Sequence, residues 1–165
     1  MRIRASIDII DTEVFHIEKA VIPMVRLLIG HKGSGKTKKM VALANESLDK
    51  VNGSVVFINK NSRLTTDLKY SIRLISMDDY EAITNVDEYI GFLYGIISQD
   101  HDLECIFIDS ILKHADINIE NLEDFLARLD KISKEHEVDL IVSISADREE
   151  LGSYIDNYDI VDLTK

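Results

Sequence analysis

Residues 30–37 read Gly30-His31-Lys32-Gly33-Ser34-Gly35-Lys36-Thr37, and this octapeptide matches the pattern G-x-x-x-x-G-K-[S/T] of a phosphate-binding loop. Its glycines let the backbone curl around a phosphate chain with successive N–H groups pointing inward. A helical pattern follows, and the unpaired N–H groups and the dipole of a helix N-terminus favour anions. We therefore expect residues 30–37 to bind the phosphates of a nucleotide.

The side chains of this loop have separate expected roles. Lys36 is expected to reach the β- and γ-phosphates, as a binding and a catalytic residue, and the Thr37 hydroxyl is expected to bind Mg²⁺. The other nucleotide-binding residues contribute backbone N–H groups or, at the lysine, additional positive charge. They are Gly30, Lys32, Gly33, Ser34 and Gly35. The predicted cofactors are therefore ATP and Mg²⁺.

Short apolar runs alternate with amphipathic helical patterns along the chain. Apolar runs predict strands at 25–29, 54–58, 73–75, 104–109 and 140–144, with a short sixth at 160–161. Apolar residues at helical spacing predict helices over 36–50, 86–99 and 119–136. The runs lack strict polar alternation, as expected when helices cover both faces of a parallel sheet. The predicted fold class is α/β, a three-layer domain with a mostly parallel sheet flanked by helices.

Two of these helices carry packing predictions. The apolar stripe of the helix over 119–136 begins at Ile119. Gly91 and Gly95 interrupt the helix over 86–99, at a cost of about 1 kcal/mol each relative to alanine. Because these glycines are one turn apart, we expect them to allow close packing of the helix against the sheet.

Asp109 follows the apolar run Cys105-Ile106-Phe107-Ile108 directly. A triphosphate site needs a carboxylate at the end of a neighbouring buried strand to hold the metal's water shell. We therefore predict that Asp109 is a metal ligand, together with Thr37, and a catalytic residue. An acid that only caps the following turn is the alternative.

The chain resembles the RecA-like branch of P-loop NTPases. The resemblance lies in the glycine loop, the strand ending Phe107-Ile108-Asp109-Ser110, and the helix-to-strand passage from Phe125 to Ser145. The resemblance covers residues 25–145, but only the glycine loop is a specific motif. Among small proteins, the chain is similar to single-domain bacterial ATP-binding proteins labelled twitching-motility ATPase-like. The resemblance implies a strand order, by starting residue, of 73, 54, 104, 140, 25 and 160. It also implies that Ser143 or Ser145 stands near the γ-phosphate as a polar sensor, with simple solvation of a strand end as the alternative.

The chain departs from this branch where a water-activating base is expected. The resemblance implies a glutamate at the end of the second strand or directly after the metal-site aspartate, where this sequence has Asn59 and Ser110. Neither side chain can act as a carboxylate base. Acids in other loops remain candidates: Asp78, Asp79, Glu81 and Asp147. Candidate arginine fingers are Arg63, Arg73, Arg128 and Arg148.

Three functions remain open on this basis. The first is an ATP-binding protein with slow or partner-dependent Mg-ATP hydrolysis, which explains both the loop and the missing base. The second is a small-molecule kinase, although the acidic second half shows no arginine-rich lid. The third is a non-catalytic nucleotide-sensing module. A single cysteine excludes a thymidine kinase of the zinc-containing type.

The composition indicates one soluble domain. The chain has 165 residues, of which 45% are hydrophobic and 30% charged, enough for a real core. The single Cys105 points to a reducing compartment, and no apolar run approaches the roughly 20 residues of a membrane span. We therefore predict a cytoplasmic single domain over 1–165 with its core at 24–165. Residues 1–23 either precede a natural start at Met24 or form a β-α addition, and both remain open.

The charge is unevenly distributed between the two halves of the chain. The net charge of −11 argues against broad binding to nucleic acid or anionic membrane. Residues 1–73 hold 13 Lys/Arg and 7 Asp/Glu, whereas residues 74–165 hold 6 and 23. The first part suits an anion such as a nucleoside triphosphate. The second is either a solvated acidic face or a surface for a basic protein partner.

Overall fold

Six strands form one sheet in the computed structural model, which describes residues 24–164. They are β1 (Val25–Gly30), β2 (Ser54–Asn59), β3 (Arg73–Ser76), β4 (Leu103–Ile108), β5 (Asp139–Ser145) and β6 (Asp159–Asp162). Their order is β3-β2-β4-β5-β1-β6, and every neighbouring pair is parallel. This confirms the strand order implied by the RecA-like resemblance, with β5 between β4 and β1. Both interpretations of residues 1–23 lie outside the described residues.

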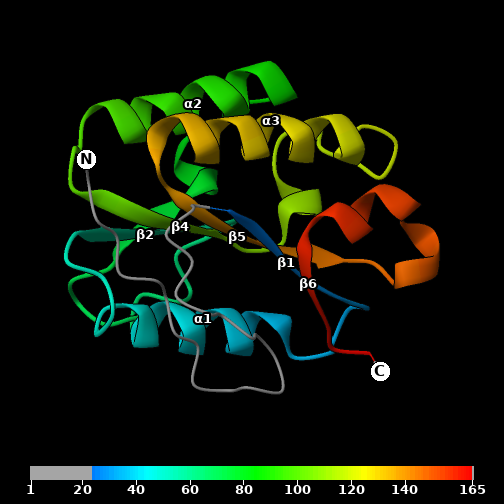
Figure 1. Ribbon diagram of the computed structural model, residues 1–165. Helices are drawn as coiled ribbons and strands as arrows, with labels where there is room; N and C mark the ends of the chain where they lie inside the picture. The colour runs from blue at the N-terminus through cyan, green and yellow to red at the C-terminus, as the bar shows by residue number, and fades with distance from the viewer. Residues whose placement is uncertain (1–23, 165) are drawn as a thin grey trace.

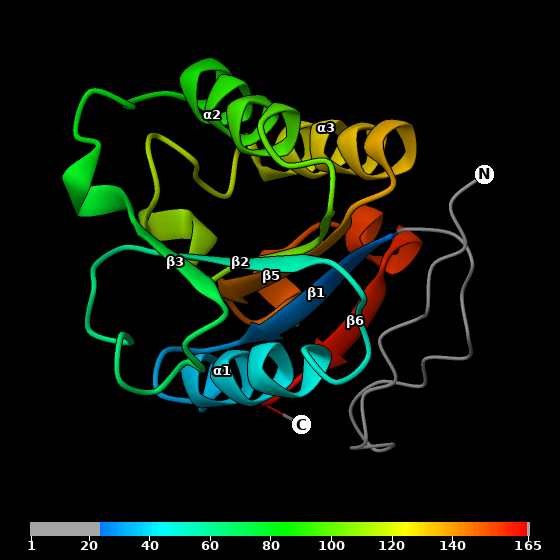
Figure 2. The ribbon, with the colours of Figure 1, turned by 90° about the vertical axis from the view of Figure 1, so that its left-hand side faces the viewer.

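Helices cover both faces of the sheet (Figures 1 and 2). Helix α1 (Lys36–Ser47) lies on one face. Helices α2 (Val86–Ser98) and α3 (Leu122–His136) lie side by side on the other. The described chain is therefore a three-layer α/β fold, as the sequence predicts.

Successive residues of the central strands point to opposite faces of the sheet, and each face has its own hydrophobic cluster. In β1, Leu27 and Ile29 pack on the side of α2 and α3, whereas Leu28 packs on the side of α1. In β4, Cys105 and Phe107 pack on the α1 side, and Ile106 and Ile108 pack on the other. Because both faces are buried, every strand position favours an apolar residue, which accounts for the unbroken apolar runs.

Helix α3 begins later than its apolar stripe predicts. Backbone N–H groups of Asn118 and Asn121 donate to each other's side-chain oxygens at 2.8 and 3.0 Å, which fixes a turn immediately before Leu122. Side chains of asparagine compete with helical hydrogen bonding in this way. Ile119 is therefore outside the helix and 36% exposed, so the prediction that it begins the buried stripe is wrong.

Gly91 and Gly95 lie on the solvent-facing side of α2. Both are exposed, and a Cβ atom built on either would meet nothing within 4 Å. The residues of α2 that pack inward are Tyr89, Ile90, Leu93, Ile96 and Ile97. The prediction that the two glycines allow close packing against the sheet is therefore wrong.

The exposed glycines give a stability prediction. We expect Gly91→Ala and Gly95→Ala each to stabilise the fold by up to about 1 kcal/mol, because alanine restricts the unfolded chain and finds open space. In a domain of this size, that gain raises Tm by about 2–4 °C in thermal unfolding. Gly53→Ala is the contrasting control, since its Cβ would lie 1.8 Å from the Asp102 carbonyl oxygen and should lower Tm. A lower Tm for either α2 variant would contradict the prediction.

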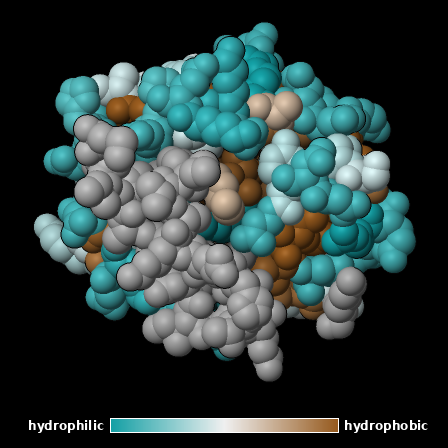
Figure 3. Space-filling view, viewed as in Figure 1, coloured by the Kyte–Doolittle hydropathy of each residue, from teal (hydrophilic) through white to brown (hydrophobic). Residues whose placement is uncertain are grey.

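The outer surface of the α2–α3 layer is mostly hydrophilic on the face shown in Figure 3. Acidic side chains at the starts of both helices contribute to it: Asp87, Glu88, Glu123 and Asp124. Tyr94 on α2 is an exception, with 37% of its surface exposed. Among residues 24–164, no helix has both the length and the apolar character needed to cross a bilayer.

Candidate functional site

The glycine loop connects the end of β1 to the start of α1. Gly33 and Gly35 have φ angles of 85° and 90°, in the left-handed region that strongly favours glycine. Gly35 is the N-cap of α1, and no described side chain caps the helix there. The N–H groups of the first helical turn therefore face the loop, in the arrangement that favours an anion.

Lys36 is buried at the centre of the loop. Its ammonium donates to the carbonyl oxygen of His31 at 2.8 Å and to the Ser34 hydroxyl at 3.3 Å. Burial lowers the pKa of Lys36 below its usual value, and the negative charge of Asp109 opposes that shift. The loop backbone thus holds the ammonium close to the Asp109 carboxylate.

Asp109 reaches the loop from the end of β4. The Thr37 hydroxyl donates to its Oδ2 at 2.8 Å, although the two residues are 72 positions apart. Ser143 in β5 donates to Oδ1 at 2.6 Å, and the Ser110 N–H donates to the Ser143 hydroxyl at 2.7 Å. The Asp109 N–H donates to the Ile58 carbonyl at 2.9 Å. A carboxylate that is 99% buried is therefore fixed at both oxygens beside Thr37.

His114 contacts the backbone of Asp109, and no sequence pattern predicted this role. The ring is fully buried, and its Nε2 donates to the Asp109 carbonyl oxygen at 2.7 Å. Its Nδ1 lies 3.4 Å from the Tyr89 hydroxyl of α2. Burial lowers the pKa of His114, which favours the neutral ring. A neutral imidazole can donate to Asp109 and accept from Tyr89, so it ties the end of β4 to α2.

A cavity of about 300 Å³, the phosphate cavity, lies between the loop and the carboxyl ends of β4 and β5. From the loop and α1 it is lined by Lys32, Gly33, Gly35, Lys36, Thr37 and Lys38. From the other side it is lined by Ser110, Lys113 and Ser145. Of the two candidate sensors, Ser145 therefore lines the cavity, whereas Ser143 is fully buried against Asp109. Gly30 ends β1 immediately before the loop.

Two further cavities adjoin the phosphate cavity. One of about 530 Å³, the α1 groove, shares Thr37 and Lys38 with it and continues along α1 past Val41 to Leu64. The other, of about 280 Å³, shares Lys113 and is here called the neighbouring cavity. Its other polar side chains include Lys60, Asp78, Tyr80, Glu81 and Thr84. The phosphate cavity therefore has room beside it on both flanks.

The structure separates the candidate bases. Asn59 ends β2 and is 8% exposed, and its amide donates to the Asn61 carbonyl at 3.2 Å. Asp147 lies 3.7 Å from His31 Nδ1 and is near enough to Lys36 to raise its pKa. Asp78 instead pairs with Lys60 at 3.0 Å, in the neighbouring cavity. Of the candidate bases, Asp147 is therefore the one that lies beside the glycine loop.

The four candidate arginine fingers lie away from the phosphate cavity, and none is among the described residues that line it. Arg128 pairs with Asp87 at 2.8 Å, and Arg148 pairs with Asp156. Arg73 is in β3, the edge strand farthest from β1 and β6. Arg63 is exposed in the segment after β2. No arginine among residues 24–164 therefore lines this cavity.

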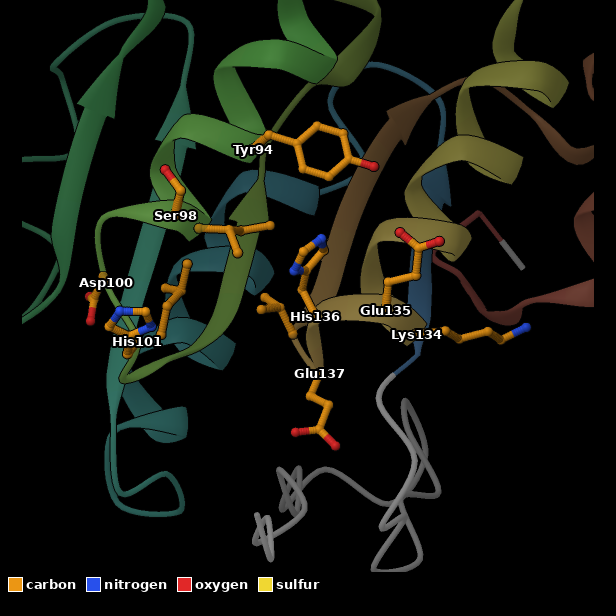
Figure 4. A pocket seen from close by; sticks show the side chains of 11 residues that line it. Tyr94, Ser98, Asp100, His101, Lys134, Glu135, His136 and Glu137 are labelled. Carbon is orange, nitrogen blue, oxygen red and sulfur yellow. The ribbon is translucent and has the colours of Figure 1, made fainter. Parts of the chain in front are cut away.

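Another cavity, of about 520 Å³, lies at the opposite end of the sheet, between the C-terminal ends of α2 and α3 (Figure 4). Tyr94 and His136 form an edge-to-face contact there, with ring centroids 5.6 Å apart. Lys134 extends away from the other labelled side chains. Ligands of open parallel sheets bind at the carboxyl ends of the strands, so this cavity is on the wrong side for the phosphate site.

Comparisons with known proteins do not identify a family for this chain. No protein-family model matches the sequence, and no curated protein matches it either. Among solved structures, the flagellar accessory protein FlaH from Methanocaldococcus jannaschii is similar, with a TM-score of 0.48 and 16% sequence identity. The similarity covers 82% of this chain and 67% of the FlaH chain. A similarity this weak does not bear on function.

Proposed function

We propose that this protein binds Mg-ATP at residues 30–37 and hydrolyses it slowly on its own, or faster with a partner. The observation that carries the proposal is the 2.8 Å hydrogen bond between the Thr37 hydroxyl and the Asp109 carboxylate. It joins the two residues expected to hold the metal, at the mouth of a loop with the full phosphate-binding pattern. A glycine turn without this function has no need to bury a carboxylate beside it.

The oxygens of Thr37 and Asp109 suit Mg²⁺. Magnesium prefers hard oxygen ligands, and it is commonly held by one or two protein oxygens together with substrate phosphates and water. Thr37 and Asp109 would hold it here, and Ser143 fixes the orientation of the Asp109 carboxylate. When bound, the metal neutralises charge on the β- and γ-phosphates.

Positive charge is concentrated where the phosphates would lie. Four lysines line the phosphate cavity of a chain whose net charge is −11: Lys32, Lys36, Lys38 and Lys113. Lys38 stands in the first turn of α1, where a cation opposes the helix dipole. A bound polyphosphate relieves that conflict, which supports an anionic ligand at this place.

The α1 groove supports a nucleotide rather than inorganic phosphate. It opens from the phosphate cavity, and Val41, Ala42 and Leu64 give it an apolar lining. Asn45 and Asp67 add polar groups to it. An apolar groove with few polar groups is the usual surroundings of a flat heterocycle, so the nucleobase has a suitable place beside the phosphates.

The neighbouring cavity keeps the small-molecule kinase as a second candidate. It adjoins the phosphate cavity at Lys113 and holds polar groups from Lys60 to Thr84. An acceptor bound there would lie next to the phosphates. Phosphate release measured without acceptors, then with a panel of nucleosides and cofactors, separates the two functions. ATP binding with neither release nor transfer would favour the nucleotide-sensing module.

The test of the metal assignment is Asp109→Asn, which keeps the size of the side chain and removes its charge. We expect Mg²⁺ to tighten ATP binding by the wild-type protein, and to do so several-fold less in the variant, because one ligand loses its charge. Isothermal titration calorimetry with ATP, in Mg²⁺ and in EDTA, measures both affinities. Asp124→Asn, an exposed acid of α3, is the matched control. An equal Mg²⁺ effect in wild type and Asp109→Asn would contradict the assignment.

A further inference from the structure

Lys113 faces the glycine loop across the phosphate cavity. It ends the short 3₁₀ helix η2 (Ile111–Lys113), which begins two residues after Asp109. Its side chain is exposed, and it forms no ion pair with any residue in 24–164, whereas Lys60 in the neighbouring cavity pairs with Asp78. Its charge is therefore available to a ligand in the cavity.

The backbone that carries Lys113 is fixed relative to Asp109. Ser110 has a φ of 58°, a left-handed conformation that a non-glycine residue adopts only at a cost. The Ser110 N–H is held by Ser143, and the Lys113 N–H donates to the Ser110 carbonyl at 2.9 Å. His114, the next residue, is anchored to the Asp109 carbonyl. These hydrogen bonds offset the cost at Ser110 and keep Lys113 on the Asp109 side of the cavity.

The two sides of the cavity correspond to different phosphates. In a site of this kind, the loop and the helix N-terminus hold the inner phosphates. Thr37 and Asp109 would hold a metal ion, which would neutralise charge on the outer phosphates. Lys113 lines the cavity on the Asp109 side, opposite the loop, so it faces the outermost phosphate.

We propose that Lys113 recognises the terminal phosphate and makes the site selective for a nucleoside triphosphate over a diphosphate. The proposal rests on the proposed function, because it assigns a residue within the same site. Electrostatics agree with the geometry. Lys36 and Lys113 both line the cavity, one from the loop and one from the opposite side. A phosphate between two ammonium groups is attracted to both.

Isothermal titration calorimetry with Mg-ATP and Mg-ADP tests this proposal on the wild type, Lys113→Ala and Lys113→Gln. We expect both variants to lose about tenfold in ATP affinity, the size of one charge-assisted contact, and to keep their ADP affinity. Lys60→Ala is the matched control, since it removes a lysine from the same end of the sheet but not from the phosphate cavity. We expect its ATP and ADP affinities to be those of the wild type.

Three results would overturn the proposal. Equal losses for ATP and ADP would show that Lys113 contacts only the phosphates they share. Unchanged ATP affinity in both variants would show no contact at all. If the wild type bound neither nucleotide, the proposed function itself would fail and the selectivity with it. Binding of both nucleotides by the wild type separates these cases.

Discussion

Lys36→Ala is expected to weaken ATP binding by about ten- to a hundredfold, the equivalent of one charge-assisted contact of 1.5–3 kcal/mol. Lys36 is 6% exposed, and its ammonium is held by the His31 carbonyl and the Ser34 hydroxyl at the centre of the loop. At that place it can meet the phosphates with little loss of side-chain entropy. Calorimetry with Mg-ATP measures the change.

The controls for Lys36→Ala have to distinguish loss of the ammonium–phosphate contact from loss of the folded structure. Lys36→Met keeps most of the aliphatic stem and removes only the charge, so it should lose nearly as much affinity as alanine. Lys131→Ala removes a lysine from α3, on the opposite face of the sheet, where the side chain is 71% exposed. Thermal unfolding of all three variants should give similar Tm values. Unchanged ATP affinity in a folded Lys36→Ala or Lys36→Met variant would contradict the assignment of Lys36 as a phosphate-binding residue.

Much of the phosphate site was predictable because its parts follow local rules. The loop needs glycine at fixed positions, and the φ angles of Gly33 and Gly35 show why. Asp109 ends an apolar run, and a buried parallel strand leaves its last polar residue at the carboxyl edge of the sheet. The strand order then brings that edge to Thr37. Spacing and topology together were enough for this pair.

The remaining parts of the site depend on tertiary contacts that leave no periodic signal. His114 acts on a backbone carbonyl, and its partner Tyr89 is 25 residues away. Lys113 matters because η2 turns it toward the loop, which no spacing rule anticipates. Ser143 and Ser145 both end the same strand, but Ser143 is buried against Asp109 and Ser145 lines the cavity. The sequence does not show the register of β5 against its neighbouring strands, so it could not predict which of the two serines lines the cavity.

The same limit explains the wrong packing predictions. An apolar stripe marks a helix face but not the residue at which the helix begins, and the turn between Asn118 and Asn121 decided that point for Ile119. Glycines one turn apart on a helix are compatible with either face. Gly91 and Gly95 belong to the exposed face because the larger apolar residues of α2 fill the buried one.

We expect the protein alone to hydrolyse ATP slowly, because Asn59 and Ser110 stand at the two positions where a water-activating glutamate was expected. Asn59 ends β2 as predicted, and its amide can orient water but cannot accept a proton. Ser110 occupies the second position at which a glutamate was expected, and it lines the phosphate cavity without supplying a carboxylate. General-base assistance commonly contributes about a hundred- to ten-thousandfold. Without it, we expect ATP to bind well and turn over poorly.

Asn59→Glu is therefore expected to raise the rate of phosphate release by about tenfold or more without tightening ATP binding, since a base acts on the water and not on the nucleotide. Phosphate release is measured side by side for wild type, Asn59→Glu and Lys36→Ala, the last reporting any contaminating activity. Asn61→Glu is the matched control, because it adds the same charge two residues later, in the loop after β2. We expect no gain from it. A rate in Asn59→Glu equal to that of the wild type, at unchanged ATP affinity, would contradict the assignment of the base position.

Robust hydrolysis by the wild type would contradict slow turnover and would mean that another carboxylate serves. Asp147 is then the first to replace, because it lies beside His31 in the glycine loop and its charge acts on Lys36. Asp147→Asn should abolish such activity while leaving ATP affinity within about twofold, since an acid makes no favourable contact with phosphate. Asp78→Asn is the comparison, as its carboxylate is engaged by Lys60 in the neighbouring cavity. Loss of activity in Asp147→Asn but not in Asp78→Asn would place the base at the loop, and the reverse would place it beside β2 and β3.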